Sequence, residues 1–208
     1  MRIQGPIRAV VFDVFGTLVD IRNPRRPYLS LMKWLRAQGR KPRPDDSVQL
    51  MCQPVGLEEA GRMFGFEVPA SVLAPWERDL VAELAGIALF DDVIPTLTAL
   101  RTRGLKLGLC SNVAQPYATP VLAQLQFAMN AYAWSFEVGA VKPNRRMYQH
   151  LCTTLACRPQ EVLFVGDTLE ADVLGPRSFG MQAQLLVRGL ESPEPGCIGG
   201  LDEVLSLV

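Results

Sequence analysis

Short apolar runs of strand length recur along the 208-residue chain. The first covers residues 7–12 and stops at Asp13, where Gly16 and Thr17 follow, as expected of a buried strand that ends in a loop. Helix-length stretches separate it from similar runs at residues 105–110, 132–136, 161–165 and 183–187. This alternation predicts an α/β fold, a Rossmann-like doubly wound parallel sheet with helices on both faces.

Residues 20–90 follow a different pattern, in which the strand signal is absent. Helix-like stretches at residues 28–38, 57–64 and 76–89 are broken by Pro42, Pro44, Pro54, Pro69 and Pro75. We expect a small all-α cap at 20–90, inserted after the first strand, and a core formed by 1–19 and 91–208. In that core, helices at 94–103 and 145–157 cover the sheet, and a Pro/Gly loop at 191–200 precedes a short terminal helix.

The overall charge excludes several classes of partner. The chain carries 21 Lys and Arg against 21 Asp and Glu, a net charge of +0, so no global field attracts nucleic acid or an anionic membrane. Its apolar runs are far shorter than the roughly 20 residues that a membrane span needs, and the start lacks the apolar core of a signal peptide. We therefore expect a cytoplasmic protein that binds neither nucleic acid nor membranes.

Histidine and cysteine chemistry is limited. The chain has 1 histidine and 5 cysteines, without a Cys-x-x-Cys pair, which is no basis for a zinc site. We interpret the cysteines as reduced packing residues. With a lone imidazole, catalysis is expected to depend on carboxylates, lysine or hydroxyl groups.

Such groups occur in four short motifs, three of which directly follow a predicted strand. The carboxyl ends of parallel strands meet at one edge of a sheet, so these motifs are expected to form a single pocket. In chain order they contain Asp13 with Thr17, Ser111 with Asn112, Lys142 before Pro143, and Asp167 with Asp172.

The four motifs and their order resemble the haloacid dehalogenase superfamily of hydrolases, and the cap between the first two resembles its helical-cap subgroup. The resemblance implies that Asp13 is a nucleophile that forms a covalent aspartyl intermediate. It implies a Mg²⁺ ion held by Asp13, the main-chain carbonyl of Phe15 and Asp167, with Asp172 either near the ion or holding Lys142.

The remaining motif residues would act on the transferring group. Thr17 and Ser111 would donate hydrogen bonds to it, Asn112 would help to position it, and Lys142 would stabilise Asp13 and the transition state. In the cap, Arg22 and Arg25 lie nearest in sequence to Asp13 and are candidates to bind the anionic part of a small substrate. Their alternative role is that of a solvated helix face.

Phe15 departs from the phosphatase pattern, because phosphatases of this superfamily carry an aspartate acid/base two residues after the nucleophile. Dehalogenases have an aromatic residue there, which suits a halide leaving group that needs no proton. Asp167 favours the phosphatase branch, because dehalogenases work without a metal and carry neutral residues at that place. The site thus combines features of both branches.

Three functions remain open. The first is Mg²⁺-dependent hydrolysis of a small phosphorylated metabolite, either with slow turnover or with a leaving group that departs without a proton. The second is a metal-independent 2-haloacid dehalogenase. The third is a catalytically silent homologue that binds a ligand or a partner. The sequence does not predict the substrate or the oligomeric state.

Overall fold

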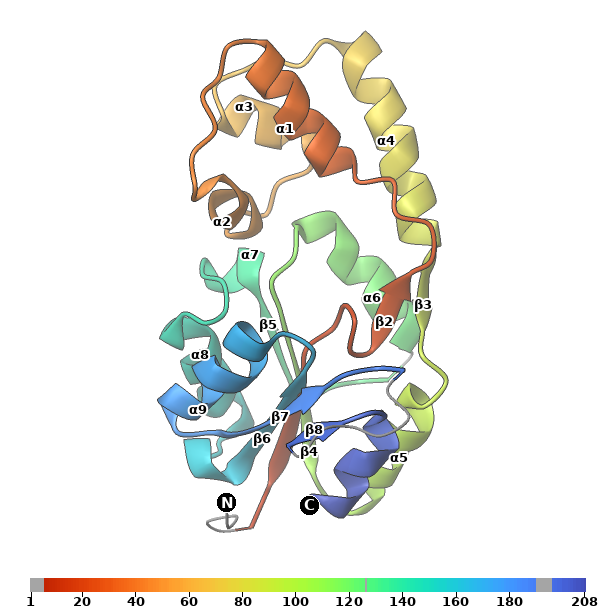
Figure 1. Ribbon diagram of the computed structural model, residues 1–208, viewed down its shortest axis with the longest axis vertical. Helices are drawn as coiled ribbons and strands as arrows, with labels where there is room; N and C mark the ends of the chain where they lie inside the picture. The colour runs from red at the N-terminus through yellow and green to blue at the C-terminus, as the bar shows by residue number, and fades with distance from the viewer. Residues whose placement is uncertain (1–5, 126, 190–195) are drawn as a thin grey trace.

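The structure is a computed structural model that describes residues 6–125, 127–189 and 196–208. Residues 191–195 of the predicted Pro/Gly loop lie outside these ranges. At its centre is a six-stranded parallel sheet in the order β5-β4-β1-β6-β7-β8, which confirms the predicted doubly wound core (Figure 1). The strands are β1 (Ala9–Phe12), β4 (Lys106–Ser111), β5 (Ala131–Trp134), β6 (Val162–Gly166), β7 (Gln182–Leu186) and β8 (Cys197–Ile198).

Strand β1 is buried on both faces, since its four residues have no exposed surface. Val10 and Phe12 pack into one hydrophobic cluster and Ala9 and Val11 into the other, as the two-residue period of a strand requires. Helices cover both faces (Figure 1). The first cluster includes residues of α5 (Val93–Thr102), α6 (Ala118–Leu125) and the terminal 3₁₀ helix η4 (Leu201–Ser206). The second includes residues of α8 (Arg145–Leu155) and the π-helix η3 (Leu169–Leu174).

Short helices complete the core. Among the helices in the described ranges, none has the length and apolar character of a membrane span. The remaining helices are η1 (Gln115–Tyr117), α7 (Ser135–Val138), η2 (Pro159–Glu161) and α9 (Gly175–Phe179). The predicted strand at 132–136 is thus too long, because Ser135 and Phe136 already belong to α7.

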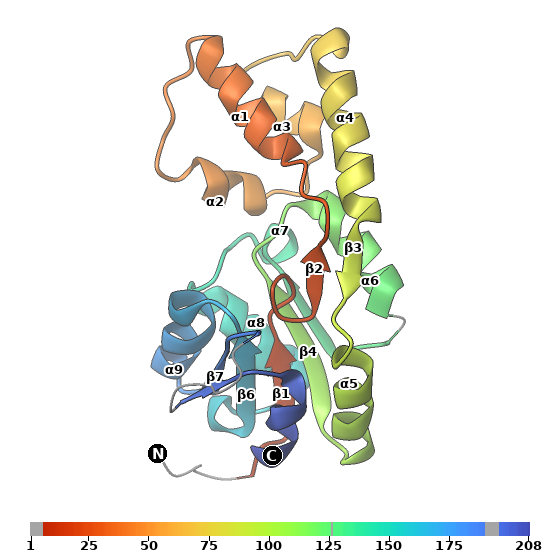
Figure 2. The same ribbon diagram turned by 45° about the vertical axis from the view of Figure 1, so that its right-hand side comes forward.

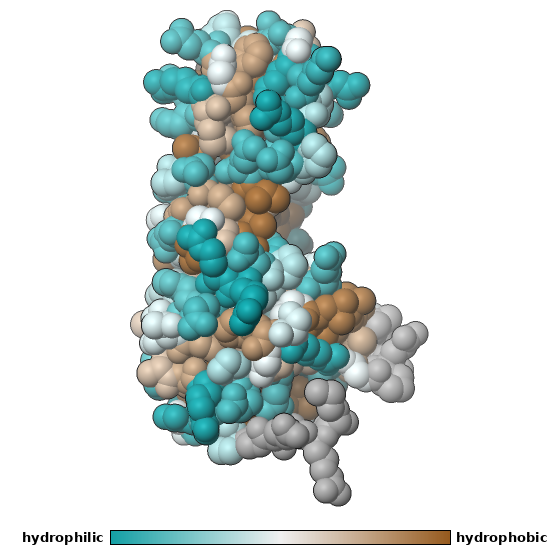
Figure 3. Space-filling model, turned by 90° about the vertical axis from the view of Figure 1, so that its left-hand side faces the viewer, coloured by the Kyte–Doolittle hydropathy of each residue, from teal (hydrophilic) through white to brown (hydrophobic). Residues whose placement is uncertain are grey.

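Four helices stand above the carboxyl edge of the sheet and form what we call the cap (Figures 1 and 2). They have a separate hydrophobic cluster, against which Trp34 and Trp76 pack as an edge-to-face pair. In Figure 3 apolar residues show at mid-height, between more hydrophilic surfaces above and below. The cap helices are α1 (Pro27–Ala37), α2 (Asp46–Met51), α3 (Leu57–Met63) and α4 (Ala70–Ala85).

The cap joins the core through two paired strands, β2 (Val19–Ile21) and β3 (Ile87–Leu89), which run antiparallel. The expectation that strands are absent between residues 20 and 90 is therefore wrong. The helix predicted over 76–89 is present as part of α4 but ends at Ala85, before β3. Strands of three residues are too short for a periodic pattern to reveal them. Pro75 does not break the helix either, since it lies inside α4. The exact division at residues 20–90 stays a prediction.

A buried ion pair holds the α1–α2 connection of the cap. Arg40 donates two hydrogen bonds of 2.6 Å to Asp46, and the Arg43 N–H donates a third at 2.9 Å. The hydrogen bonds from Arg40 lower the pKa of Asp46 from 3.8 to about 2, against the opposing effect of burial. The guanidinium group of Arg40 also packs on the ring of Phe64, with its carbon 4.3 Å from the ring centroid.

We expect Asp46→Asn to lower the free energy of unfolding by about 1–3 kcal/mol at neutral pH, because it weakens charged hydrogen bonds to a buried group. The folded pKa of Asp46 lies below its unfolded value, so the stabilisation is present above about pH 4 and is lost as the pH falls towards 2. Urea titrations across that window would measure the difference, with exposed Asp45→Asn as control. An equal loss at both ends of the window would contradict this account.

Candidate active site

Asp13 lies at the carboxyl end of β1, between β4 and β6, where the order of strands in the sheet changes direction. Its N–H donates to the Val165 carbonyl of β6 at 2.9 Å. The loop then turns tightly at Gly16, whose φ of +82° favours glycine. A Cβ at Gly16 would lie 2.1 Å from Oδ2 of Asp167. The absence of a side chain at Gly16 therefore lets the Asp13 loop and Asp167 approach each other.

Lys142 connects two of the predicted carboxylates. Its Nζ donates to Oδ1 of Asp13 at 2.5 Å and to Oδ1 of Asp172 at 2.6 Å. The lysine side chain is 3% exposed and the two carboxylates 10% and 1%. Oδ2 of Asp172 accepts the Thr168 N–H at 3.0 Å. Asp172 thus holds Lys142, which is one of its two predicted roles.

The charges in this cluster are unbalanced. Burial raises the pKa of Asp13 from 3.8 to about 6; Lys142 opposes this shift and Asp172 adds to it. Burial alone would lower the pKa of Lys142, but the carboxylates of Asp13 and Asp172 outweigh it and raise the pKa above its ordinary value. With Asp167 alongside, three carboxylates face one ammonium group. A cation would relieve the excess negative charge.

The donor set fits a divalent cation with hard oxygen ligands. Asp13, Asp167 and Asp172 each offer a carboxylate oxygen within 4.8 Å of the others. Carboxylate oxygens are the ligands that Mg²⁺ prefers. In addition, Oγ1 of Thr17 is buried without a hydrogen-bond partner among the described residues. Buried hydroxyl groups are normally paired, so Thr17 has a donor left for a bound group.

The side chain of Asn112 forms hydrogen bonds with the main chain of Lys142, whereas Ser111 ends a strand of the sheet. The Asn112 side chain accepts the Lys142 N–H at 2.7 Å and donates to the Lys142 carbonyl at 3.0 Å. Its amide is therefore engaged with the main chain of Lys142, and its predicted part in positioning the transferring group stays a prediction. Ser111 is the last residue of β4 and is buried.

The two cap arginines, Arg22 and Arg25, form no polar contact with the carboxylate cluster among the described residues. Arg22 and Arg25 are exposed, and in the described parts of the chain their guanidinium groups make no hydrogen bond or ion pair. The main-chain N–H of Arg25 instead donates to Glu83, a buried residue of α4. Glu83 also accepts the hydroxyl of Tyr117 from the core at 2.5 Å. The predicted role of the arginines in substrate binding stays a prediction.

Arg188, like Glu83, forms contacts between distant parts of the chain that sequence reasoning missed. It donates to the Thr17 carbonyl through Nε at 3.1 Å and forms two hydrogen bonds of 3.0 Å with Asp92. Its guanidinium lies over the ring of Phe90 at 3.8 Å. Arg188 follows β7, Asp92 follows the exit from the cap, and Thr17 precedes its entry. This contact therefore fixes both crossings between core and cap.

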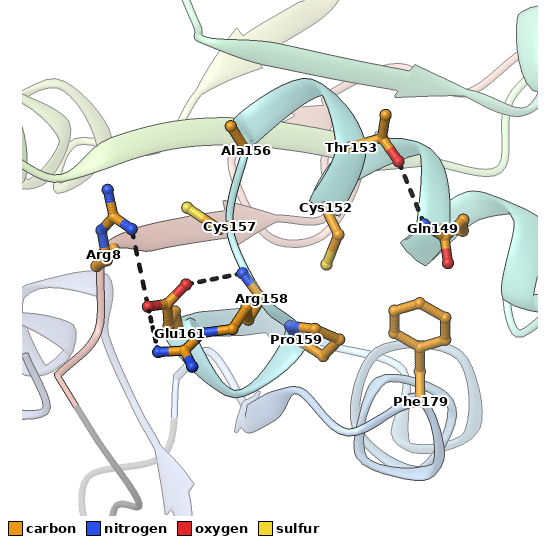
Figure 4. A pocket seen from close by; sticks show the side chains of 10 residues that line it. All are labelled: Arg8, Gln149, Cys152, Thr153, Ala156, Cys157, Arg158, Pro159, Glu161 and Phe179. Atoms are coloured by element: carbon orange, nitrogen blue, oxygen red, sulfur yellow. Dashed lines mark hydrogen bonds and ion pairs between the residues drawn. The ribbon is translucent and has the colours of Figure 1, made fainter.

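A cavity of about 640 Å³ lies elsewhere, beside the amino ends of the strands (Figure 4). Arg8 and Glu161, which precede β1 and β6, line it together with Cys152 and Cys157. Glu161 is already paired with Arg158 at 3.1 Å. Burial, with a smaller contribution from Cys157, raises the pKa of the Cys152 thiol to about 11, so that thiol is protonated and a poor nucleophile. We do not assign the active site to this cavity.

The fold is a Rossmann-like α/β core that carries a cluster of carboxylates at the carboxyl edge of its parallel sheet. A family model, haloacid dehalogenase-like hydrolase, matches residues 7–180, and the chain belongs to that family. The resemblance seen in the sequence is thereby confirmed. The helical-cap subgroup stays a prediction.

Curated relatives are phosphatases. A glyceraldehyde 3-phosphate phosphatase from Methanothermobacter thermautotrophicus is 24% identical and aligns over 90% of this chain and 89% of that protein. One from Methanopyrus kandleri is 30% identical, but the match spans only 48% of this chain and 44% of that protein.

Solved structures support the fold. A HAD phosphatase from Thermococcus onnurineus has a TM-score of 0.67 at 23% identity, over 97% of both chains. A 2-haloacid dehalogenase from Pseudomonas syringae pv. tomato has a TM-score of 0.65 at 18% identity, over the same shares. Both branches of the family therefore share this architecture.

Proposed function

We propose that the protein hydrolyses a small phosphorylated metabolite in a Mg²⁺-dependent reaction that passes through an aspartyl phosphate on Asp13. The observation that carries this proposal is the cluster in which a carboxylate oxygen of Asp167 lies within 4.8 Å of carboxylate oxygens of Asp13 and Asp172. A third carboxylate beside a nucleophile would repel an anionic substrate unless a cation neutralised it. The phosphatase names of the curated relatives support the same conclusion.

Each residue of the cluster has a defined task in this reaction. Asp13 attacks phosphorus with a carboxylate oxygen, and Lys142 orients that carboxylate and stabilises negative charge that develops beside it. Asp172 and Asn112 hold Lys142 in place. The hydroxyl groups of Thr17 and Ser111 donate to the phosphoryl oxygens. Asp13, Asp167 and the Phe15 carbonyl would hold Mg²⁺, which would neutralise charge on the phosphate.

A dehalogenase is the second candidate, and Phe15 is the observation that favours it, because an aromatic residue there suits a leaving halide. Asp167 opposes it for the electrostatic reason given above. Chloride release from a 2-haloacid in the presence of EDTA would identify this activity. The cytoplasm stays the expected compartment for either enzyme.

The deciding experiment is the acid-quenched intact mass of the protein after mixing with acetyl phosphate and Mg²⁺. Acyl-phosphate donors phosphorylate a reactive carboxylate without needing a proton for the leaving acetate. We expect a phosphoryl adduct that maps to Asp13, because Phe15 cannot activate water to remove it quickly. No adduct and no released phosphate would overturn the proposal in favour of the dehalogenase or a silent homologue.

A separate prediction concerns Asp167, which is not one of the acceptors of Lys142. We expect Asp167→Asn to weaken Mg²⁺ binding at least about tenfold, because an amide oxygen is a poorer ligand than a carboxylate. Isothermal calorimetry would measure the affinity, with Asp91→Asn, an exposed residue outside the cluster, as control. Unchanged Mg²⁺ affinity in Asp167→Asn would remove Asp167 from the metal site.

A further inference from the structure

Phe15, two positions beyond the proposed nucleophile Asp13, lies against other aromatic side chains. The ring of Phe15 meets that of Tyr117 edge-on, with centroids 6.0 Å apart and planes at 85°. Tyr117 lies 6.3 Å from Tyr28 of the cap helix α1. We call these three residues the aromatic wall; it runs from the nucleophile loop to the cap. Phe15 and Tyr28 pack against the first hydrophobic cluster and are only partly buried, so the protein does not fully cover the aromatic wall.

Tyr117, whose ring meets that of Phe15, carries a hydroxyl group, but its proton is already committed. It donates to Oε1 of Glu83 at 2.5 Å. Glu83 is 4% exposed, and its other oxygen accepts the Arg26 N–H at 2.6 Å as well as the Arg25 N–H. Burial, and the hydrogen bond with Glu83, raise the pKa of Tyr117 above its ordinary value. Tyr117 is therefore poorly suited to replace the missing acid.

Other donors are equally unsuited. The ammonium of Lys142 donates to Asp13 and Asp172. The guanidinium groups of the cap arginines do not release a proton at physiological pH. His150, the one imidazole of the chain, lies on α8, where its Nε2 is 3.0 Å from the Tyr132 carbonyl. The hydroxyl of Tyr28 donates to the Val55 carbonyl at 3.3 Å. Of these donors in the described part of the chain, none is thus free to protonate a leaving oxygen beside Phe15.

We infer that the preferred substrate is an aryl phosphate monoester, whose leaving group departs as a phenolate and packs on the aromatic wall. This inference rests on the proposed function and specifies its substrate class. An oxygen of Asp13 forms a bond to phosphorus while the bond from phosphorus to the phenolic oxygen breaks, and the electron pair leaves with the phenolate. Water then cleaves the aspartyl phosphate, which releases inorganic phosphate, restores the carboxylate and gives a proton to solvent. The phenolate takes its proton from solvent after release.

The test compares phosphate compounds whose leaving groups differ in acidity. They are substituted phenyl phosphates from nitrophenyl to methoxyphenyl, one alkyl phosphate, and acetyl phosphate, a mixed anhydride whose acidic leaving group is not aromatic. The quantity to compare is kcat/KM, because hydrolysis of the common phosphoenzyme affects kcat equally for all of them. We expect kcat/KM to fall by about 10²–10⁴-fold from the nitrophenyl to the alkyl ester, which is the usual effect of a missing general acid. Acetyl phosphate should react more slowly than the nitrophenyl ester.

Two matched variants test the assignment of Tyr117. Tyr117→Phe and Tyr28→Phe each remove one hydroxyl from the aromatic wall and keep the ring. We expect both to leave the ratio of kcat/KM between nitrophenyl and phenyl phosphate unchanged. A ratio that rises in Tyr117→Phe alone would identify Tyr117 as the acid and overturn the inference.

Three further outcomes of the substrate comparison would each overturn a different part of the argument. An alkyl ester hydrolysed as fast as the aryl esters would overturn the inference and leave the proposed function intact. Acetyl phosphate reacting faster than the nitrophenyl ester would overturn the role of the aromatic wall. No Mg²⁺-dependent phosphate release from any of these compounds would overturn both the proposed function and this inference.

Discussion

Replacing Asp13 by asparagine is expected to abolish turnover and the phosphoryl adduct, with a loss of roughly 10⁴-fold or more, the size found when a catalytic nucleophile is removed. An amide keeps the shape of the side chain and still accepts a hydrogen bond from Lys142, but it is not a nucleophile. Phosphate release and the acid-quenched mass would both be measured. A residual rate within tenfold of the unmodified protein would mean that Asp13 is not the nucleophile.

The control for this variant must separate chemistry from folding. Asp13→Asn also removes one charge from the buried contact with Lys142, which keeps Asp172 as its partner. Loss of one partner of a buried ion pair destabilises by up to about 3–5 kcal/mol. Urea unfolding of Asp13→Asn and of the exposed Asp91→Asn would show whether the variant is still folded under assay conditions.

Replacing Phe15 by aspartate is expected to act in the opposite direction and to raise kcat/KM for an alkyl phosphate by about 10²–10⁴-fold. The new carboxyl group would supply the leaving group with a proton and then take one from the attacking water. The gain should be smaller for nitrophenyl phosphate, whose leaving group is already stable as an anion. Initial rates with both esters, at a fixed Mg²⁺ concentration, would measure the difference.

Phe15→Asn is the matched control, because it changes the ring to a side chain of the same size as aspartate without an ionisable proton. We expect it to lack the gain. If Phe15→Asn and Phe15→Asp accelerate the alkyl ester equally, the effect comes from space opened beside Tyr117 rather than from proton transfer.

The sequence predicted the parts of the molecule that follow from local pattern. Strand-length apolar runs correctly indicated five of the six strands of the parallel sheet, because a buried parallel strand is apolar on both faces. Strand β8 was missed, because its two residues lie within the stretch predicted as a Pro/Gly loop. The same reasoning brought Asp13, Lys142 and Asp172 together, since their loops lie at one edge of the sheet. It failed for β2 and β3, which are too short to show a period.

The contacts at the junction of cap and core could not be predicted from the sequence. Glu83 and Tyr117 are 34 residues apart, and Arg188 and Asp92 are 96 apart. Neither pair has a characteristic spacing, and a charged or phenolic residue taken alone indicates a surface position. Only the folded chain reveals that these residues are paired across the junction.

The antiparallel pairing of β2 with β3 also has a consequence for the evolution of the chain. The polypeptide leaves and re-enters the core at neighbouring points, as Val19 opposes Leu89. An insertion whose ends are already together adds little loop-closure entropy when its length changes, about 0.6 kcal/mol for each doubling. Helices can therefore be gained, lost or exchanged between these two strands while the sheet and its carboxylates stay unchanged.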